Sequence, residues 1–118
     1  MESNFKREDF KNLLNKSIYI FPSGNNVPRR FDKKEDLIKE VTLTKLGRLT
    51  FAFGDNTYKI NGELNKYNAG YYAFPTYQDC INQIIKDEVC RGLRYEYNLS
   101  LLTIDEIMTI KKMFDSKQ

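Results

Sequence analysis

The sequence contains no histidine and no tryptophan, and only two cysteines among its 118 residues. The missing histidine excludes nucleophile pairs of the Ser-His and Cys-His kinds, which need an imidazole as general base. Zinc usually takes about four nitrogen or sulfur ligands, which two thiols without histidine do not supply. A magnesium site built from scattered carboxylates stays open, but no pattern marks one. We therefore predict no catalytic residue, no metal site and no cofactor, and we interpret the chain as a binding protein rather than an enzyme.

The two cysteines, Cys80 and Cys90, lie in one segment with helical apolar spacing. Ten residues of helix span about 15 Å, whereas the Cα atoms of a disulfide lie within about 7 Å of each other. We therefore expect two free thiols and a reducing compartment.

Long apolar runs are also missing. No stretch approaches the roughly 18 apolar residues of a membrane span. The first ten residues, MESNFKREDF, have no apolar run after their charges, so we expect no signal peptide and a cytoplasmic location. Lys and Arg number 19 against 16 Asp and Glu, a net charge of +3, which by itself does not indicate nucleic acid.

The centre of the chain, residues 40–60, is rich in the residues that suit a half-buried pleated surface. Leu49, Phe51 and Phe53 alternate with smaller or polar residues, which is typical of a strand. Gly47 predicts a turn or bulge, and Gly54-Asp55-Asn56 predicts a tight turn. We expect about five antiparallel strands, over residues 17–21, 40–46, 49–53, 57–60 and 71–74.

Helical spacing marks both ends of the chain, so the expected class is α+β in a single domain, residues 1–118. We expect an N-terminal helix within residues 1–16, a strand-rich part over 17–75 and two helices within 76–118. Thr76 and Thr103 each open a capping-box pattern. The N-terminal helix is either a lid on the sheet or a helix offered to a partner. The apolar stripe of the first C-terminal helix is expected to pack into the core, and the last helix to close it. That stripe consists of Tyr77, Ile81, Ile84, Ile85 and Val89.

The most basic local run lies between residues 27 and 36. It is either a solvated loop with internal ion pairs or a patch for phosphate or carboxylate groups, to which paired arginines are suited. Arg91, Arg94, Tyr95 and Tyr97 are either a surface connector or a site for single-stranded nucleic acid. The residues predicted to bind a partner are Arg29, Arg30, Lys33, Lys34, Lys45, Arg48, Tyr67 and Tyr71.

The segment Thr44-Lys45-Leu46-Gly47-Arg48 and the helix opening Leu102-Thr103 carry a resemblance. Together with the order of elements from Ser17 to Phe114, they resemble small β-barrel accessory proteins of phages and mobile elements of Gram-positive bacteria. The chain departs from that group at Leu49-Thr50, where aromatic residues are common, and in its N-terminal helix. The resemblance implies that residues 17–75 form an SH3-like, partly open β-barrel, with helices at one end.

Two functions are expected from these observations. The first is a stoichiometric inhibitor that binds a bacterial defence protein, in the manner of an anti-CRISPR protein acting on a Cas nuclease. Small size, many tyrosines and the resemblance favour it. The alternative is a small barrel that binds nucleic acid through its basic residues, with Phe31 and Tyr19 as stacking partners. A third possibility is a phage adaptor that acts only by oligomerisation.

Overall fold

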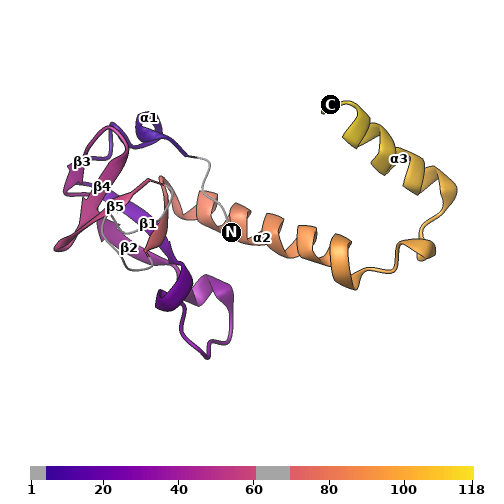
Figure 1. The fold of residues 1–118 in the computed structure, drawn as a ribbon, viewed down its shortest axis with the longest axis horizontal. Coiled ribbons are helices and arrows are strands. Elements are labelled where there is room, and N and C mark those ends of the chain that lie inside the picture. Colours follow the sequence, from indigo (N-terminus) through magenta and orange to yellow (C-terminus); the bar gives the residue numbers. More distant parts are fainter. Residues whose placement is uncertain (1–4, 61–69) are drawn as a thin grey trace. The chain divides into compact units, whose positions relative to one another are not determined.

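The computed structural model describes residues 5–60 and 70–118 of the chain. The chain divides into two compact units, residues 1–87 and 88–118, called here the N-terminal unit and the C-terminal unit. The described residues form two small three-stranded antiparallel sheets and three α-helices, so the α+β class is confirmed (Figure 1).

The first sheet has β1 (Ser17–Pro22) between β2 (Lys39–Thr42) and β6 (Tyr71–Phe74). Ile18 lies opposite Val41, and Ile20 lies opposite Ala73. Both isoleucines are fully buried, whereas Tyr19 between them is only half-buried. The predicted period of two is therefore confirmed in β1, because alternate side chains point to opposite faces of a sheet.

The second sheet has β4 (Thr50–Phe53) between β3 (Lys45–Leu46) and β5 (Asn56–Lys59). Gly54 turns the chain from β4 into β5 with a φ of +58°, a conformation that glycine adopts without a Cβ clash. The predicted turn is thus confirmed.

The described residues contain six strands, whereas the sequence predicted about five. The single strand expected over residues 40–46 is two strands in different sheets. Leu43, which is fully buried, separates them: its N–H donates to the Lys16 carbonyl at 2.9 Å. The next residue, Thr44, donates its N–H to the Ala52 carbonyl at 2.8 Å. The backbone therefore leaves the first sheet and joins the second within two residues.

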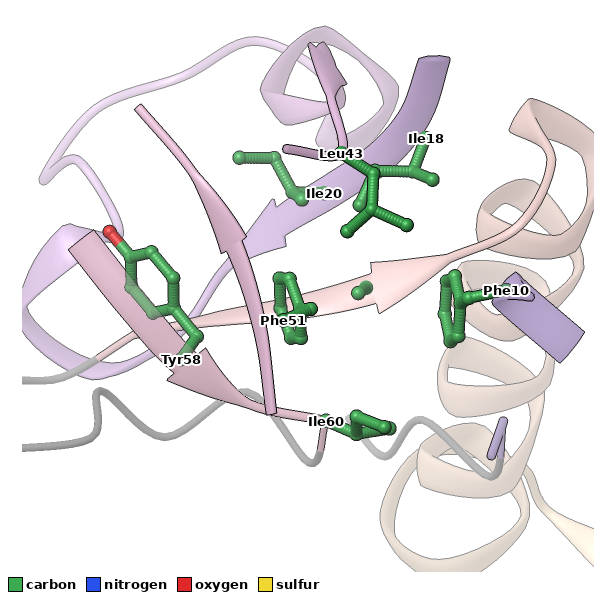
Figure 2. Close-up of a cluster of buried hydrophobic side chains, with 8 residues drawn as sticks. Phe10, Ile18, Ile20, Leu43, Phe51, Tyr58 and Ile60 are labelled. Carbon is green, nitrogen blue, oxygen red and sulfur yellow. The ribbon is translucent and has the colours of Figure 1, made fainter. Parts of the chain in front are cut away.

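One hydrophobic core lies between the two sheets, as Figure 2 shows. Phe51 occupies its centre, with its ring stacked at 6.5 Å from that of Phe10 and 5.8 Å from that of Tyr58 between centroids. A second buried cluster, Phe21, Phe74, Cys80 and Ile84, packs the first half of α2 (Tyr77–Arg91) against β1 and β6. The full membership of the first cluster is Phe10, Ile18, Ile20, Leu43, Phe51, Tyr58, Ile60 and Ala73.

Two predictions about the first two helices need correction. The helix expected within residues 1–16 is only the four-residue α1 (Arg7–Phe10), and Asn15, with a φ of +65°, is not helical. In α2 only Cys80 and Ile84 are buried, while Tyr77, Ile85 and Val89 are exposed. Twelve residues are not a whole number of 3.6-residue turns, so the apolar stripe winds by about 120° around the helix axis between Tyr77 and Val89. Only the part of its path near Cys80 and Ile84 is buried.

The C-terminal unit contains the end of α2, a five-residue π turn (Gly92–Glu96), a short 3-10 turn (Leu99–Leu101) and α3 (Ile104–Asp115). The predicted capping box is present at α3: Glu106 N–H donates to Thr103 Oγ1 at 3.2 Å, and Thr103 N–H donates to Glu106 Oε1 at 3.0 Å. No residue of α3 is buried, and the expectation that its apolar side closes the core stays a prediction.

Candidate binding surfaces

The basic loop between β1 and β2 carries four of the predicted partner-binding residues. Arg29, Arg30 and Lys33 are exposed, and Lys34 is half-buried at the start of the 3-10 turn Lys34–Leu37. Phe31 stands between these cations with 42% of its surface exposed, so it does not plug the core. Leu37 packs against the second buried cluster and anchors the end of the loop.

The other two predicted cations lie on a different side of the N-terminal unit. Lys45 is in β3, and Arg48 is in the turn between β3 and β4. Arg7 Nε donates to the Gly47 carbonyl at 3.1 Å, which holds this turn against α1. Figure 1 shows α1 and β3 on one side of the strands and the β1–β2 loop on another. The structure thus groups Arg48 with α1 and not with Arg29 and Arg30.

Tyr71 takes part in an aromatic cluster. Its ring packs edge-on against Phe53 at 5.6 Å and Tyr58 at 5.7 Å, and the latter two rings stack at 4.5 Å. Burial, with a smaller effect from Tyr71, raises the pKa of the Tyr58 hydroxyl above its usual value. Tyr67, the other predicted tyrosine, lies outside the described residues.

A pocket of about 520 Å³ opens where α1 meets the turn between β3 and β4. Its apolar lining comes from Phe5, Leu49 and Ile60, and its charged lining is Lys6, Arg7, Glu8 and Arg48. Sequence reasoning named Arg48 but not the cations of α1. No local signal could have found them, since Arg7 and Gly47 are 40 residues apart and only the folded chain brings them together.

The second candidate surface is the apolar side of the C-terminal unit. Leu101 is 81% exposed, Tyr95 79% and Ile104 71%. Sequence reasoning assigned this region to a connector and to a core-facing helix, because an apolar stripe alone does not tell a buried face from an exposed one. The exposed large apolar residues after α2 are Leu93, Tyr95, Tyr97, Leu99, Leu101, Ile104, Met108, Met113 and Phe114.

Chemically reactive groups are few in the described part of the chain. No three Cys, Asp or Glu residues gather there in a way that could hold a metal ion. Burial raises the pKa of the Cys80 thiol to about 12, so this group stays protonated at neutral pH and is a poor nucleophile. Cys90 is exposed, and both thiols are free. None of the described helices combines the length and the hydropathy that crossing a bilayer requires.

Comparison of the chain with protein-family models, curated proteins and solved structures finds no match. The resemblance to small β-barrel proteins of phages therefore stays a prediction, as does the partner class that it implies.

Proposed function

We propose that this chain is a protein-binding protein without catalytic activity, and that its C-terminal unit is the surface that receives the partner. The observation that carries the proposal is the exposure of large apolar side chains from Leu93 to Phe114. Burying such a side chain contributes about 1.5–3 kcal/mol. Exposed apolar surface of this kind commonly marks a contact with another molecule.

The spacing and charge of α3 favour a protein as that molecule. Ile104, Ile107 and Met108 recur at i, i+3 and i+4, the spacing with which a helix enters an apolar groove of a partner. Ile104 and Met108 are exposed and Ile107 is half-buried, and the exposed Phe114 follows two turns after Ile107. Residues 103–118 carry three lysines and three carboxylates, so they lack the net positive charge that attracts phosphate backbones or anionic lipid. The same unit holds Tyr95, Tyr97 and Arg94, residue types that are enriched at interface hot spots.

The resemblance supplies the class of partner. Accessory proteins of phages and mobile elements meet bacterial defence proteins, so we propose a defence protein, with a Cas nuclease as the first candidate. Inhibition would follow from occupancy of the partner alone. Two three-stranded sheets around one shared core are compatible with the SH3-like barrel that the resemblance predicts.

The experiment is a capture assay with the purified, tagged chain and lysate from bacteria that carry CRISPR systems. We expect mass spectrometry to identify a defence protein and interference assays to show that the chain inhibits it. The double variant Ile104→Gln/Phe114→Gln alters only exposed positions, so it should fold, and should weaken binding about tenfold or more. Leu14→Gln, at an exposed apolar residue of the N-terminal unit, is the matched control and should bind normally.

Two outcomes would contradict this proposal. One is a capture experiment that recovers no defence protein from any CRISPR-carrying host. The other is a defence protein that the wild-type chain and the α3 double variant retain equally, because the apolar face of α3 would then take no part in binding.

A second candidate function is nucleic-acid binding by the β1–β2 loop. The exposed ring of Phe31 between Arg30 and Lys33 is the observation that favours it, since bases stack on aromatic rings beside cations. We expect a gel shift at low salt that weakens as salt rises, and Arg29→Gln/Arg30→Gln should reduce it. A shift that stays absent at low salt with both single and double strands eliminates this function.

A further inference from the structure

The pocket beside α1 combines two segments that are distant in sequence. Residues 5–8 form one wall, and the turn with Arg48 and Leu49 forms another. Two hydrogen bonds fix these walls: Arg7 Nε donates to the Gly47 carbonyl at 3.1 Å, and Ile60 N–H donates to the Leu49 carbonyl at 3.0 Å. One of these bonds joins two backbone groups, and the other joins the exposed Arg7 side chain to the backbone of the turn.

The charged part of the pocket is cationic. Lys6, Arg7 and Arg48 line it against a single carboxylate, Glu8, which leaves a formal charge of +2. In the part of the chain that the structure describes, none of these three cations forms a salt bridge. The side chains of Lys6, Arg7 and Arg48 are exposed, so they can reach an incoming anion at little desolvation cost.

The remaining lining is apolar. Phe5 is half-buried, Ile60 is buried, and Leu49 projects with 73% of its surface exposed beside Arg48. A leucine at this exposed position of a turn contributes little to the core, so its apolar surface is available to a ligand. A volume of about 520 Å³ lies within the range of pockets that bind small organic ligands.

We propose that this pocket binds a carboxylate attached to an apolar body, with the carboxylate between Arg48 and Arg7 and the apolar body against Leu49 and Ile60. Arginine favours carboxylates because its planar guanidinium can donate two parallel hydrogen bonds. Two sources share this chemistry: a free aliphatic or aryl acid, and the C-terminus of a peptide that ends in a large apolar residue. This site is independent of the apolar face of α3.

The test is NMR titration of the full-length chain labelled with nitrogen-15. The probes are octanoate for the free acid and the peptide acetyl-Gly-Ser-Leu-Phe for the C-terminus, each compared with its uncharged amide. Binding should shift the backbone N–H signals of Arg7, Arg48 and Leu49. The probe that binds more tightly shows whether the carboxylate comes from a free acid or from a peptide C-terminus. Each uncharged amide should bind more weakly than its acid, by up to about fivefold for each ion pair that is lost at an exposed site.

Variants at exposed residues test the assignment without disturbing the fold. Arg48→Gln should weaken binding of the preferred acid about fivefold and leave binding of its uncharged amide unchanged. Leu49→Ser should weaken binding of the acid and of the amide equally, because both probes have the same apolar body. Arg94→Gln, at an exposed arginine of the C-terminal unit, is the matched control and should change neither. Equal binding of acid and amide, equal loss in Arg94→Gln, or no change at these signals with either probe at millimolar concentration would each overturn the proposal.

Discussion

The ring of Tyr97 lies against the backbone of Gly92, at the place where α2 gives way to the π turn. A Cβ atom added to residue 92 would come closer than 3.0 Å to three atoms of that ring. Tyr97 N–H also donates to the Gly92 carbonyl at 2.7 Å, and Arg91 forms a salt bridge with Glu96 at 3.4 Å. These contacts within the C-terminal unit set the path of the chain from α2 toward α3.

The first prediction concerns Gly92→Ala. We expect the new methyl group to displace the Tyr97 ring, while the free energy of unfolding changes by less than about 1 kcal/mol, since alanine favours the helix by about that amount. The measurement is the nuclear Overhauser effect between the Tyr97 ring and residue 92. In a Tyr97→Ala background the same substitution should raise stability, because no ring is then displaced. Ring contacts that persist in Gly92→Ala would contradict this account.

Phe51 is the subject of the second prediction. Its ring packs against those of Phe10, Phe53 and Tyr58 and is almost completely buried. We expect Phe51→Ala to lower the free energy of unfolding by about 3–5 kcal/mol, through lost burial and the cavity left behind. Phe31→Ala, at a ring that is 42% exposed, is the control and should change it by less than about 1 kcal/mol. Chemical denaturation measures both, and similar losses would contradict the central place of Phe51.

Local chemistry made several elements predictable from the sequence. Alternation predicted β1, and the residues Gly54-Asp55-Asn56 predicted the turn after β4. The bounds of β6, Tyr71–Phe74, were also predicted. The capping residues Thr76 and Thr103 located the starts of α2 and α3, because a cap acts within three residues of itself. These features depend on contacts that are close in sequence.

The features that sequence reasoning missed depend on distant contacts. The break at Leu43 is set by the Lys16 carbonyl, and α1 is short because Asn15 N–H donates to the Leu43 carbonyl at 2.7 Å. The exposure of α3 could not be predicted, since an amphipathic pattern does not name the surface that covers it. At the pocket, Arg48 was predicted from the sequence as a partner-binding residue, whereas Lys6 and Arg7 join it only through the fold.

The third prediction concerns the pH dependence set by Cys80. Burial raises the pKa of its thiol from 9.0 to about 12 in the folded chain. Between these values the unfolded thiol has lost its proton and the folded one retains it, so stability must fall as pH rises from about 9 to about 12. The raised pKa of Tyr58 acts in the same direction at the upper end of this range. In Cys80→Ala the free energy of unfolding should decline less steeply with pH, and an unchanged slope would contradict the assignment.

The two thiols should also differ in reactivity, which is the fourth prediction. Cys80 is buried with a raised pKa, whereas Cys90 is exposed near the end of α2. Ellman's reagent at pH 8 should therefore modify one thiol per folded chain, and Cys90→Ser should abolish that fast reaction. Full unfolding in denaturant should make the second thiol, Cys80, accessible to the reagent. Fast modification of Cys80 in the folded Cys90→Ser variant would show that α2 opens more readily than its packing suggests.

The last prediction concerns the start of α3, where Glu106 accepts a hydrogen bond from the Thr103 backbone and completes the capping box. This bond, followed by that with the Thr103 side chain, lowers the pKa of Glu106 below its usual value of 4.5. Because the pKa is lowered in the folded chain, the ionised Glu106 stabilises α3 fully above about pH 4.5. This stabilisation is lost as pH falls through the pKa that Glu106 has in the folded chain. The helical carbon-13 shifts of residues 104–115 should therefore weaken in acid. Glu106→Gln keeps an acceptor without a titrating group, so its α3 should respond less to pH, whereas an identical acid response in both chains would show that the loss comes from other carboxylates.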